Sequence, residues 1–213
     1  MRELPKEPIG LVADSHSHTA LLLDAIRRLK EMGAKQIIHL GDVCDSLMPE
    51  ALPFAVDILQ SHDVQTVMGN NEYSIITDYT QEHQNGVTPE LIGHLKKLPY
   101  VISMVNLCFT HSAPFRWPAA TRRPITDYLH RLLLDEKPPF KILFRGHSHS
   151  PSVIEIKNGK ANEFHVISGQ RVSLKPELSY IVTVGAVEDS SCALFMPKTL
   201  EVQFIALGPI IEK

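Results

Sequence analysis

The segment IGLVADSHSH, residues 9–18, joins an apolar run to a cluster of polar side chains. Its first five residues are apolar, as in a buried strand, and the polar cluster marks the point where such a strand would end. Asp14, His16 and His18 then alternate along the chain. The residues that follow, TALLLDAIRRLKEMG (19–33), carry apolar side chains near helical spacing, and they predict a helix with Thr19 as its N-cap and Gly33 at its end.

The same alternation continues through the first half of the chain. KQIIHL (35–40) and VQTVM (64–68) are short apolar segments typical of strands, and a helix opened by Pro49 is expected over 49–61 between them. Strands that alternate with helices form a mostly parallel sheet with right-handed crossovers. The first half therefore predicts an α/β arrangement.

The second half of the chain is richer in strands. Helices are expected at 88–97 and near 125–134, and the last third contains short β-rich segments separated by turns, with KNGK (157–160) as a hairpin signal. We find no Gly/Ser-rich linker, internal repeat or low-complexity tract. We therefore expect residues 1–213 to form one domain, in which a second, antiparallel sheet packs on the first.

Composition excludes several classes of protein. Hydrophobic residues make up 44% of the chain and charged residues 21%, which is typical of globular proteins, and no apolar run approaches the roughly 20 residues of a membrane-spanning helix. Three widely spaced cysteines argue against a disulfide framework, and no secretory signal is recognisable, so we expect a cytoplasmic protein. A formal net charge of −3 argues against bulk binding to nucleic acid. The composition leaves a homo-oligomer open.

Polar residues follow most of the expected strands. Ligands of open α/β sheets gather at the carboxyl ends of the strands, so these loops should converge on one crevice. The residues in question are Asp14 and His16, then Asp42 and Asp45 in GDVCD, Asn70, Asn71 and Glu72 in GNNE, His111 in THS, and His147 and His149 in GHSH. Carboxylate, imidazole and amide groups without thiolate suit Mn, Fe, Zn or Ni. These candidates are too many for one ion and suit two ions that share a carboxylate.

The motifs DSH, GDVCD, GNNE, THS and GHSH, in this order, resemble those of the calcineurin-like metallophosphoesterase superfamily, and most closely its small single-domain phosphodiesterase-type members. This resemblance implies a four-layer αββα sandwich of two mixed β-sheets flanked by helices. It also implies that Asp14, His16 and His149 hold one divalent ion, that Asp42 bridges, and that Asn70, His111 and His147 complete the second site. The resemblance favours manganese, with Fe, Zn, Ni or Mg as alternatives, and a small phosphoester as substrate.

Two positions depart from the family pattern. The family usually has a histidine after the GN asparagine, where it can protonate the leaving oxygen, and here that position is Asn71. An amide donates a hydrogen bond but not a proton. We therefore take Asn71 and Asp45 as catalytic candidates, expect Asp45 to bind the Asn71 amide, and consider Glu72 or another histidine as the proton donor. The second departure is Ser46, where the protein-phosphatase and dinucleoside-tetraphosphatase branches typically have arginine.

Other side chains near the motifs have competing interpretations. His18 is expected to be an exposed bystander, and His39 to lie in the core or behind the ligands. The loop 113–124 follows His111 and contains Arg116 and Trp117, which are candidates for contacting substrate. The alternative interpretation is a proline-stiffened surface loop. Arg145 is expected to be packed or ion-paired within its strand.

Three functions remain at this point. The leading prediction is a dinuclear-metal phosphoesterase in which a hydroxide that bridges the ions attacks phosphorus in line. A non-catalytic interaction scaffold that retains the metal site is the alternative, since the family fold is also used in that way. The opening DSHSH also resembles the start of metal-dependent amidohydrolases, whose (β/α)8 fold typically needs about 250 residues and leaves the other motifs unexplained.

Overall fold

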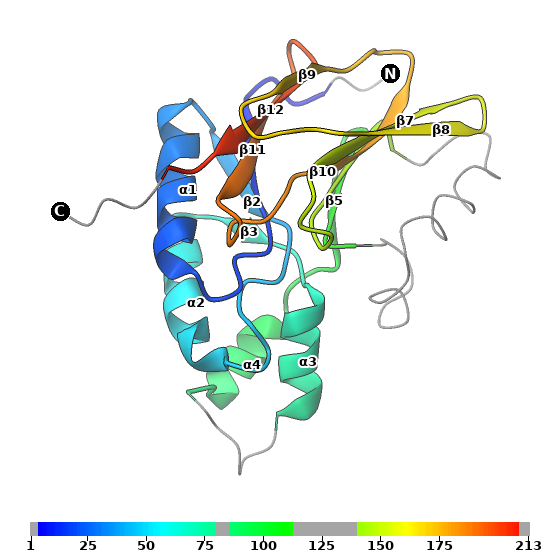
Figure 1. Cartoon of the computed structure of the whole chain (residues 1–213). Helices are drawn as coiled ribbons and strands as arrows, with labels where there is room; N and C mark the ends of the chain where they lie inside the picture. Colours follow the sequence, from blue (N-terminus) through cyan, green and yellow to red (C-terminus); the bar gives the residue numbers. More distant parts are fainter. Residues whose placement is uncertain (1–3, 80–85, 113–139, 209–213) are drawn as a thin grey trace.

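Two six-stranded β-sheets face each other in the computed structural model, which describes residues 4–79, 86–112 and 140–208. Figure 1 shows the two sheets in the upper part of the molecule and the helices along one outer face and below. Both sheets contain parallel and antiparallel pairs. The predicted α/β sandwich of two mixed sheets is therefore confirmed.

The first sheet has the strand order β3-β2-β1-β11-β12-β9. Its strands are β1 (Ile9–Val12), β2 (Gln36–His39), β3 (Gln65–Thr66), β9 (Arg171–Ser173), β11 (Ser191–Met196) and β12 (Glu201–Ala206). Strands β1, β2 and β3 run parallel, as their alternation with helices predicts. The C-terminal strand β11 pairs antiparallel with β1, so the end of the chain extends the sheet that its beginning starts.

The second sheet has the strand order β4-β5-β6-β10-β7-β8. Its strands are β4 (Val101–Met104), β5 (Leu107–Thr110), β6 (Ile142–Arg145), β7 (Ser152–Lys157), β8 (Lys160–His165) and β10 (Ser179–Thr183). This sheet is not purely antiparallel as expected, because β6 pairs parallel with both β5 and β10. Strands β5 and β6 therefore end at the same edge, which brings the residues after them together.

The main core fills the space between the two sheets. Phe144 of β6 stacks on Phe109 of β5, with ring centroids 5.5 Å apart, and approaches Phe195 of β11 in the other sheet at 5.0 Å. Leu11 and Ile38 from the parallel strands join the same cluster. Burial of such side chains contributes about 1.5–3 kcal/mol each to the stability of the fold, so this layer holds the two sheets together.

Helices α1 (Thr19–Glu31) and α2 (Leu52–Ser61) cover the outer face of the first sheet (Figure 1). Leu22, Ala25, Ile26 and Leu29 form the buried stripe of α1, at the spacing that the sequence predicts. Helices α3 (Asn70–Asp78) and α4 (Pro89–Leu95) pack together beside α2. The helix expected near 125–134 lies outside the described residues.

Three local predictions need correction. Thr19 is the first residue of α1 rather than its N-cap, and His18 takes the cap position without a side-chain hydrogen bond. The helix expected over 49–61 is divided into a short 3-10 turn, Pro49–Ala51, and α2. The strand expected at 64–68 is shorter, and pairs with β2 at Gln65 and Thr66 alone. The backbone N–H of Met68 donates to the carbonyl of Pro99 instead of to β2.

The architecture also separates the alternatives. The described strands form two separate sheets instead of the closed parallel ring of a (β/α)8 fold, so the amidohydrolase interpretation is wrong. Within the described ranges, no helix is both long enough and apolar enough to cross a bilayer.

Candidate metal centre

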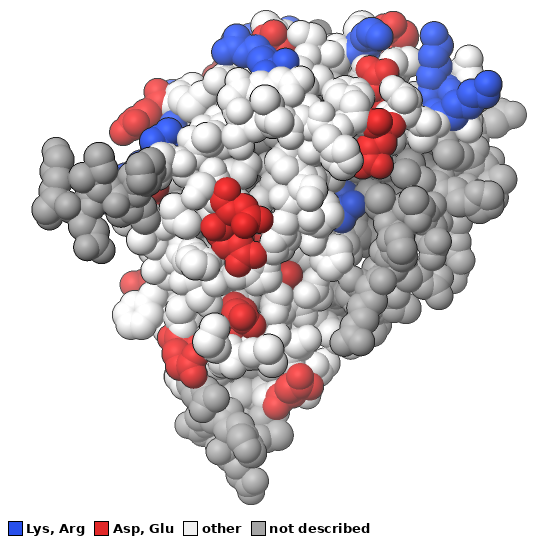
Figure 2. Space-filling model, in the orientation of Figure 1, with Lys and Arg blue, Asp and Glu red and all other residues white. Residues whose placement is uncertain are grey.

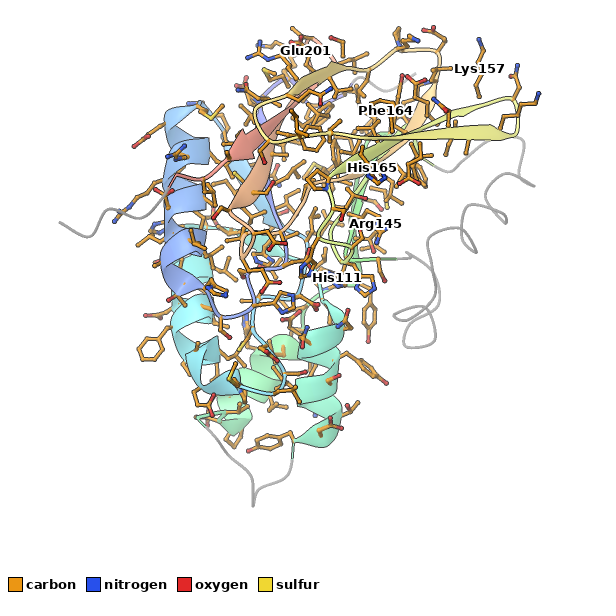
Figure 3. All side chains as sticks on the ribbon, viewed as in Figure 1. His111, Arg145, Lys157, Phe164, His165 and Glu201 are labelled. Atoms are coloured by element: carbon orange, nitrogen blue, oxygen red, sulfur yellow. The ribbon has the colours of Figure 1, made fainter. Side chains whose placement is uncertain are left out.

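The seven predicted metal ligands come together where strands of the two sheets end. Figure 3 labels His111 at this level, below the sheets and above α3. The first sheet contributes Asp14 and His16 after β1, Asp42 after β2 and Asn70 at the start of α3, and the second sheet contributes His111 after β5 and His147 and His149 after β6. Both sheets thus supply side chains to one site, as expected for loops at the carboxyl ends of strands.

Asp14, His16 and His149 form one group of donor atoms. The Nε2 atoms of His16 and His149 are 3.3 Å apart. Asp14 Oδ1 lies 3.6 Å from His149 Nε2 and 4.0 Å from His16 Nε2. Three atoms at these separations can share one ion at ligand distances of about 2.0–2.2 Å.

Asp42, Asn70, His111 and His147 form the second group. His111 Nε2 lies 3.3 Å from Asp42 Oδ2, 3.0 Å from Asn70 Oδ1 and 3.1 Å from His147 Nδ1. Asp42 Oδ2 is also 3.9 Å from His16 Nε2 in the first group. This oxygen therefore lies between the two groups, where a bridging carboxylate is required.

The residues present fit a pair of divalent ions. Asp14 Oδ1 is fully buried, and none of the described residues donates a hydrogen bond to it, whereas its other carboxylate oxygen accepts from the backbone N–H of His147. A buried carboxylate oxygen without a donor is costly unless a cation binds it. The donors are carboxylate, imidazole and amide groups, so the site suits Mn, Fe or Zn rather than a thiolate-bound cluster.

Backbone strain is concentrated in the same loops. Five of the seven predicted ligands have positive φ: Asp14 (51°), His16 (38°), Asp42 (57°), His147 (72°) and His149 (56°). Side chains other than glycine rarely adopt this region, at a cost of order 1–3 kcal/mol each, and such residues cluster at functional sites. The loops are therefore shaped to direct these five side chains inward at the expense of backbone energy.

Close approach of two loops explains the glycines before Asp42 and Asn70. Gly41 has φ +89°, and a Cβ there would lie 2.8 Å from the Gly69 backbone. At Gly69, which is extended, a Cβ would lie 2.2 Å from the backbone nitrogen of Asp42. The GD and GN turns are thus in backbone contact, and this contact sets the distance between Asp42 and Asn70.

Glu72 holds these two turns together. It is fully buried, and its carboxylate accepts the backbone N–H groups of Gly69, Asp42 and Val43 at 2.8, 2.9 and 2.8 Å. Burial, together with the nearby Asp42 carboxylate, raises the pKa of Glu72 to about 7. The three donors use both carboxylate oxygens, so Glu72, which was one of the alternatives for the missing histidine, is directed at the backbone.

His39 lies behind the ligands, as predicted. It is fully buried, its Nδ1 accepts the backbone N–H of Gly41, and its Nε2 lies 3.0 Å from the hydroxyl of Ser15. The Ser15 hydroxyl donates to the Val43 carbonyl, so its oxygen must accept a hydrogen bond from the N–H at Nε2. His39 is therefore a neutral imidazole that ties the loop after β1 to the loop after β2.

Asp42 and His111 shift each other's pKa values in the metal-free centre. Burial opposes a charge on His111, but the adjacent Asp42 carboxylate outweighs it and raises the pKa of His111 to about 9. Burial likewise opposes the charge of Asp42, but His111 holds the pKa of Asp42 well below its ordinary value. Burial and the positive charge of His111 lower the pKa of His147 to about 4. His111 Nδ1 lies 2.8 Å from the Leu40 carbonyl, which directs Nε2 toward the ligand group.

Asn71 contacts Asp42, and not Asp45 as expected. Its amide nitrogen donates to Asp42 Oδ2 at 2.8 Å, and its backbone N–H donates to Asp42 Oδ1 at 2.9 Å. The amide oxygen accepts the backbone N–H of Ser46, while Asp45 Oδ1 accepts that of Leu47. The Asp45 side chain is thus engaged within its own turn, so the expected contact between Asp45 and the amide is absent.

The remaining candidates are distributed as follows. His18 is exposed, as predicted. Arg145 is 4% exposed within β6, in line with a packed residue, and none of the described residues accepts a hydrogen bond from its Nε. The loop 113–124, with Arg116 and Trp117, lies outside the described residues.

Glu188 is a neighbour of the site that the sequence analysis did not identify, and it approaches His149. The sequence feature that could have indicated it is the acidic pair at 188–189, which interrupts an apolar segment.

Comparison with known proteins identifies similar chains. The family model of the calcineurin-like phosphoesterase superfamily domain matches residues 8–184. An uncharacterised protein from Methanocaldococcus jannaschii is 23% identical over 98% of this chain and 90% of its own. A metallophosphoesterase from Sphaerobacter thermophilus superposes with a TM-score of 0.75, at 18% identity over 96% of this chain and 89% of that one. A structure described as a novel archaeal phosphodiesterase gives a TM-score of 0.52, at 14% identity over 94% of this chain and 99% of that one.

Proposed function

Because the chain belongs to the calcineurin-like phosphoesterase superfamily, we propose that it is a dinuclear-metal phosphoesterase that hydrolyses phosphodiesters in preference to phosphomonoesters. The observation that carries the proposal is the position of Asp42 Oδ2, which lies 3.3 Å from His111 Nε2 in one donor group and 3.9 Å from His16 Nε2 in the other. A single carboxylate between two convergent donor groups is the arrangement required by a two-metal phosphoryl-transfer site.

The proposed ligand assignment follows the two donor groups. Asp14, His16 and His149 would hold the first ion. Asn70, His111 and His147 would hold the second, with Asp42 bridging. Manganese is the proposed ion, because hard carboxylate and amide oxygens are combined with imidazole and no thiolate is present among the ligands.

Two bound divalent ions would supply a bridging hydroxide as nucleophile at neutral pH and neutralise charge on the phosphoryl oxygens. The chain's own residues set the geometry around them. Asn71 directs its amide N–H to Asp42 Oδ2 and holds that carboxylate in one orientation. It cannot transfer a proton to a departing oxygen, so the residues in place favour esters whose leaving groups need no proton.

The substrate and compartment belong to the same proposal. A small phosphodiester with an activated or delocalised leaving group fits a site that has Asn71 where an acid would otherwise stand. A cytoplasmic location is supported by Cys44, Cys108 and Cys192, which are all free and buried.

The test combines metal content with turnover of bis-p-nitrophenyl phosphate in the presence of Mn²⁺. We expect two ions per chain, and loss of both bound metal and turnover in Asp42→Asn. Asp57→Asn, an exposed change on α2, is the matched control and should behave as the wild type. Two bound ions without turnover of any activated ester would indicate an interaction scaffold instead. Faster hydrolysis of alkyl monoesters than of diesters would contradict the diester preference.

A further inference from the structure

The turn between β10 and β11 lies against the end of β1. The backbone N–H of Val187 donates to the Ala13 carbonyl at 2.8 Å, and that of Glu188 donates to the Asp14 carbonyl at 3.2 Å. The turn is closed by a hydrogen bond from Ser191 N–H to the Ala186 carbonyl. Glu188 is therefore held by backbone contacts next to a predicted metal ligand, and its position does not depend on its side chain.

The Glu188 carboxylate makes one close contact. Its Oε1 lies 2.9 Å from His149 Nδ1, within hydrogen-bond distance, whereas it is 4.0 Å from His16 Nε2. The other oxygen is 4.0 Å from His18 Nε2. Figure 2 shows acidic side chains near the middle of this face, where Figure 1 draws the connection between β10 and β11. Of these three distances, only the one to His149 is within hydrogen-bond range.

This contact determines which nitrogen of His149 faces the centre. A carboxylate accepts hydrogen bonds only, so Nδ1 must carry the proton that it shares with Glu188. In the neutral ring the lone pair then lies on Nε2, which is the atom 3.6 Å from Asp14 Oδ1 and 3.3 Å from His16 Nε2. The opposite tautomer would direct an N–H group at the position of the ion, where it could not coordinate.

His149 needs such a partner more than the other histidines do. The side chain of His111 is 1% exposed and is oriented by burial and by the Leu40 carbonyl, whereas that of His149 is 32% exposed. An exposed imidazole without an acceptor at Nδ1 is free to rotate and to change tautomer. A carboxylate at Nδ1 removes both freedoms.

We propose that Glu188 is a positioning residue: it accepts a hydrogen bond from the N–H at Nδ1 of His149 and thereby presents Nε2 to the first ion. The inference rests on the proposed function, because it concerns one ligand of that centre. His149, Glu188 and Asp189 also satisfy the spacing of a separate cation site. However, Asp189 Oδ2 is 3.7 Å from His149 Nδ1 and the Asp189 side chain is 62% exposed, so the geometry is that of a histidine–carboxylate pair.

The first experiment measures Mn²⁺ binding by calorimetry. Glu188→Ala should weaken binding at one of the two sites by about 10–100-fold, the effect expected for loss of a partner behind a ligand. Glu188→Gln should recover most of this loss, because the amide oxygen can still accept a hydrogen bond from the N–H at Nδ1. Asp189→Asn is the matched control at the neighbouring position and should bind as the wild type does.

A double-mutant cycle identifies the route of the effect. If Glu188 acts through His149, then Glu188→Ala should cause no further loss of affinity in the His149→Ala background. An equal loss in both backgrounds would overturn the proposal, because Glu188 would then act on the ion independently. Unchanged affinity in Glu188→Ala would overturn it as well.

A metal-free readout separates this proposal from the proposed function. Two-bond ¹H–¹⁵N spectra of histidine-labelled metal-free protein, at a pH where the ring is neutral, should show His149 protonated at Nδ1 in the wild type and mainly at Nε2 in Glu188→Ala. The same tautomer in both proteins would contradict the positioning role. A wild type that shows the expected tautomer but binds no ion and hydrolyses no ester would instead contradict the proposed function.

Discussion

Asn71 is the residue at which the chemistry of this site departs most from an acid-assisted phosphoesterase. Its amide is bound to Asp42 and to the backbone of Ser46, so both of its polar atoms have partners and neither can supply a proton. Glu72 is equally engaged with three backbone N–H groups. The described part of the centre thus offers ligands and hydrogen bonds, and its rate should depend strongly on the leaving group.

Asn71→His should reduce that dependence. A histidine at this position can donate a proton to the departing oxygen, and such assistance is worth about 10²–10⁴-fold, most of it for poor leaving groups. We expect kcat/KM for phosphodiesters with weakly acidic leaving groups to rise by up to about 10²-fold, while activated aryl esters change little. The measurement is kcat/KM across a series of aryl and alkyl diesters. If kcat/KM falls equally steeply with leaving-group pKa in the wild type and in Asn71→His, the introduced histidine does not act as a proton donor.

His39 makes the metal-free protein sensitive to acid. Burial, together with the positive charge of His111, lowers the pKa of His39 from 6.5 to about 3. Because the folded pKa lies below the unfolded one, the unfolded state binds more protons between these values, and stability falls as the pH decreases from 6.5 toward 3. The contribution is up to about 1.4 kcal/mol per pH unit.

His39→Asn should therefore flatten the acid limb of the stability profile. The free energy of unfolding of the metal-free protein would be measured in urea at several pH values between neutral and mildly acidic. The absolute stability of the variant will be lower, because the hydrogen bonds to Gly41 and Ser15 are altered, so the slope is the relevant quantity. His165→Asn, at an exposed position of β8, should keep the wild-type slope. Equal slopes for all three proteins would contradict the assignment.

At the scale of elements, the ligand positions could be predicted because strand ends are visible in the sequence. Apolar runs that stop at DSH and GD place their polar residues at one sheet edge whatever the details of pairing. The side-chain directions were not predictable in the same way. Asn70 and Glu72 are both in GNNE, but α3 begins at Asn70, so the two residues lie about 200° apart around the helix. One faces the centre and the other faces the neighbouring backbone.

Contacts formed in the folded protein explain why the partner of Asp45 was predicted wrongly and why Glu188 was not predicted. Asp45 caps its own turn through Leu47, and this local contact replaced the expected one with Asn71. Glu188 lies in a turn of the β-rich third, far along the chain from any motif, and it reaches the centre because β11 pairs with β1. Such a neighbour is defined by sheet order, which local patterns of residues do not specify.

Gly69→Ala tests the contact between the two turns. A Cβ at this position would lie 2.2 Å from both the backbone nitrogen and a carboxylate oxygen of Asp42, so one turn must move away from the other. We expect a loss of stability of several kcal/mol and loss of metal binding at the second site, since overpacking alone costs typically about 1–3 kcal/mol. Thermal unfolding and metal stoichiometry are the measurements.

Gly93→Ala is the matched control for this change. It lies within α4, and apart from its chain neighbours and the helix's own backbone, no atom of the described residues lies within 4 Å of the position that the alanine methyl group would take. Alanine should therefore stabilise the helix, by about 0.8–1 kcal/mol at most. Opposite signs for the two glycine substitutions are the expected result. A Gly69→Ala protein with wild-type stability and two bound ions would show that the turns tolerate separation.

At the scale of the whole molecule, the centre lies between the two sheets. The first donor group combines Asp14 and His16 from the first sheet with His149 from the second. The second group combines Asp42 and Asn70 with His111 and His147 in the same way. Each ion would therefore link the two sheets at the edge where the strained loops meet, and the phenylalanine layer between the sheets would hold them together farther along the strands.

Removal of metal should therefore lower the stability of the whole fold rather than of one loop. An ion that binds the folded state alone stabilises it by about 2.7 kcal/mol per site at a free concentration of 100 Kd. For a chain of this size each kcal/mol corresponds to about 2–4 °C, so saturation with Mn²⁺ should raise Tm by roughly 5–10 °C per site over the chelated protein. Differential scanning calorimetry with Mn²⁺ and with EDTA measures this shift as a single transition. Asp42→Asn should show little of it, because the residue between both sites is changed, whereas Asp57→Asn should show the full shift. If the wild type binds two ions and still unfolds at the same temperature with and without them, the ions bind the folded and unfolded chain equally well, and the assignment of both ions to a site that only the folded protein builds is wrong.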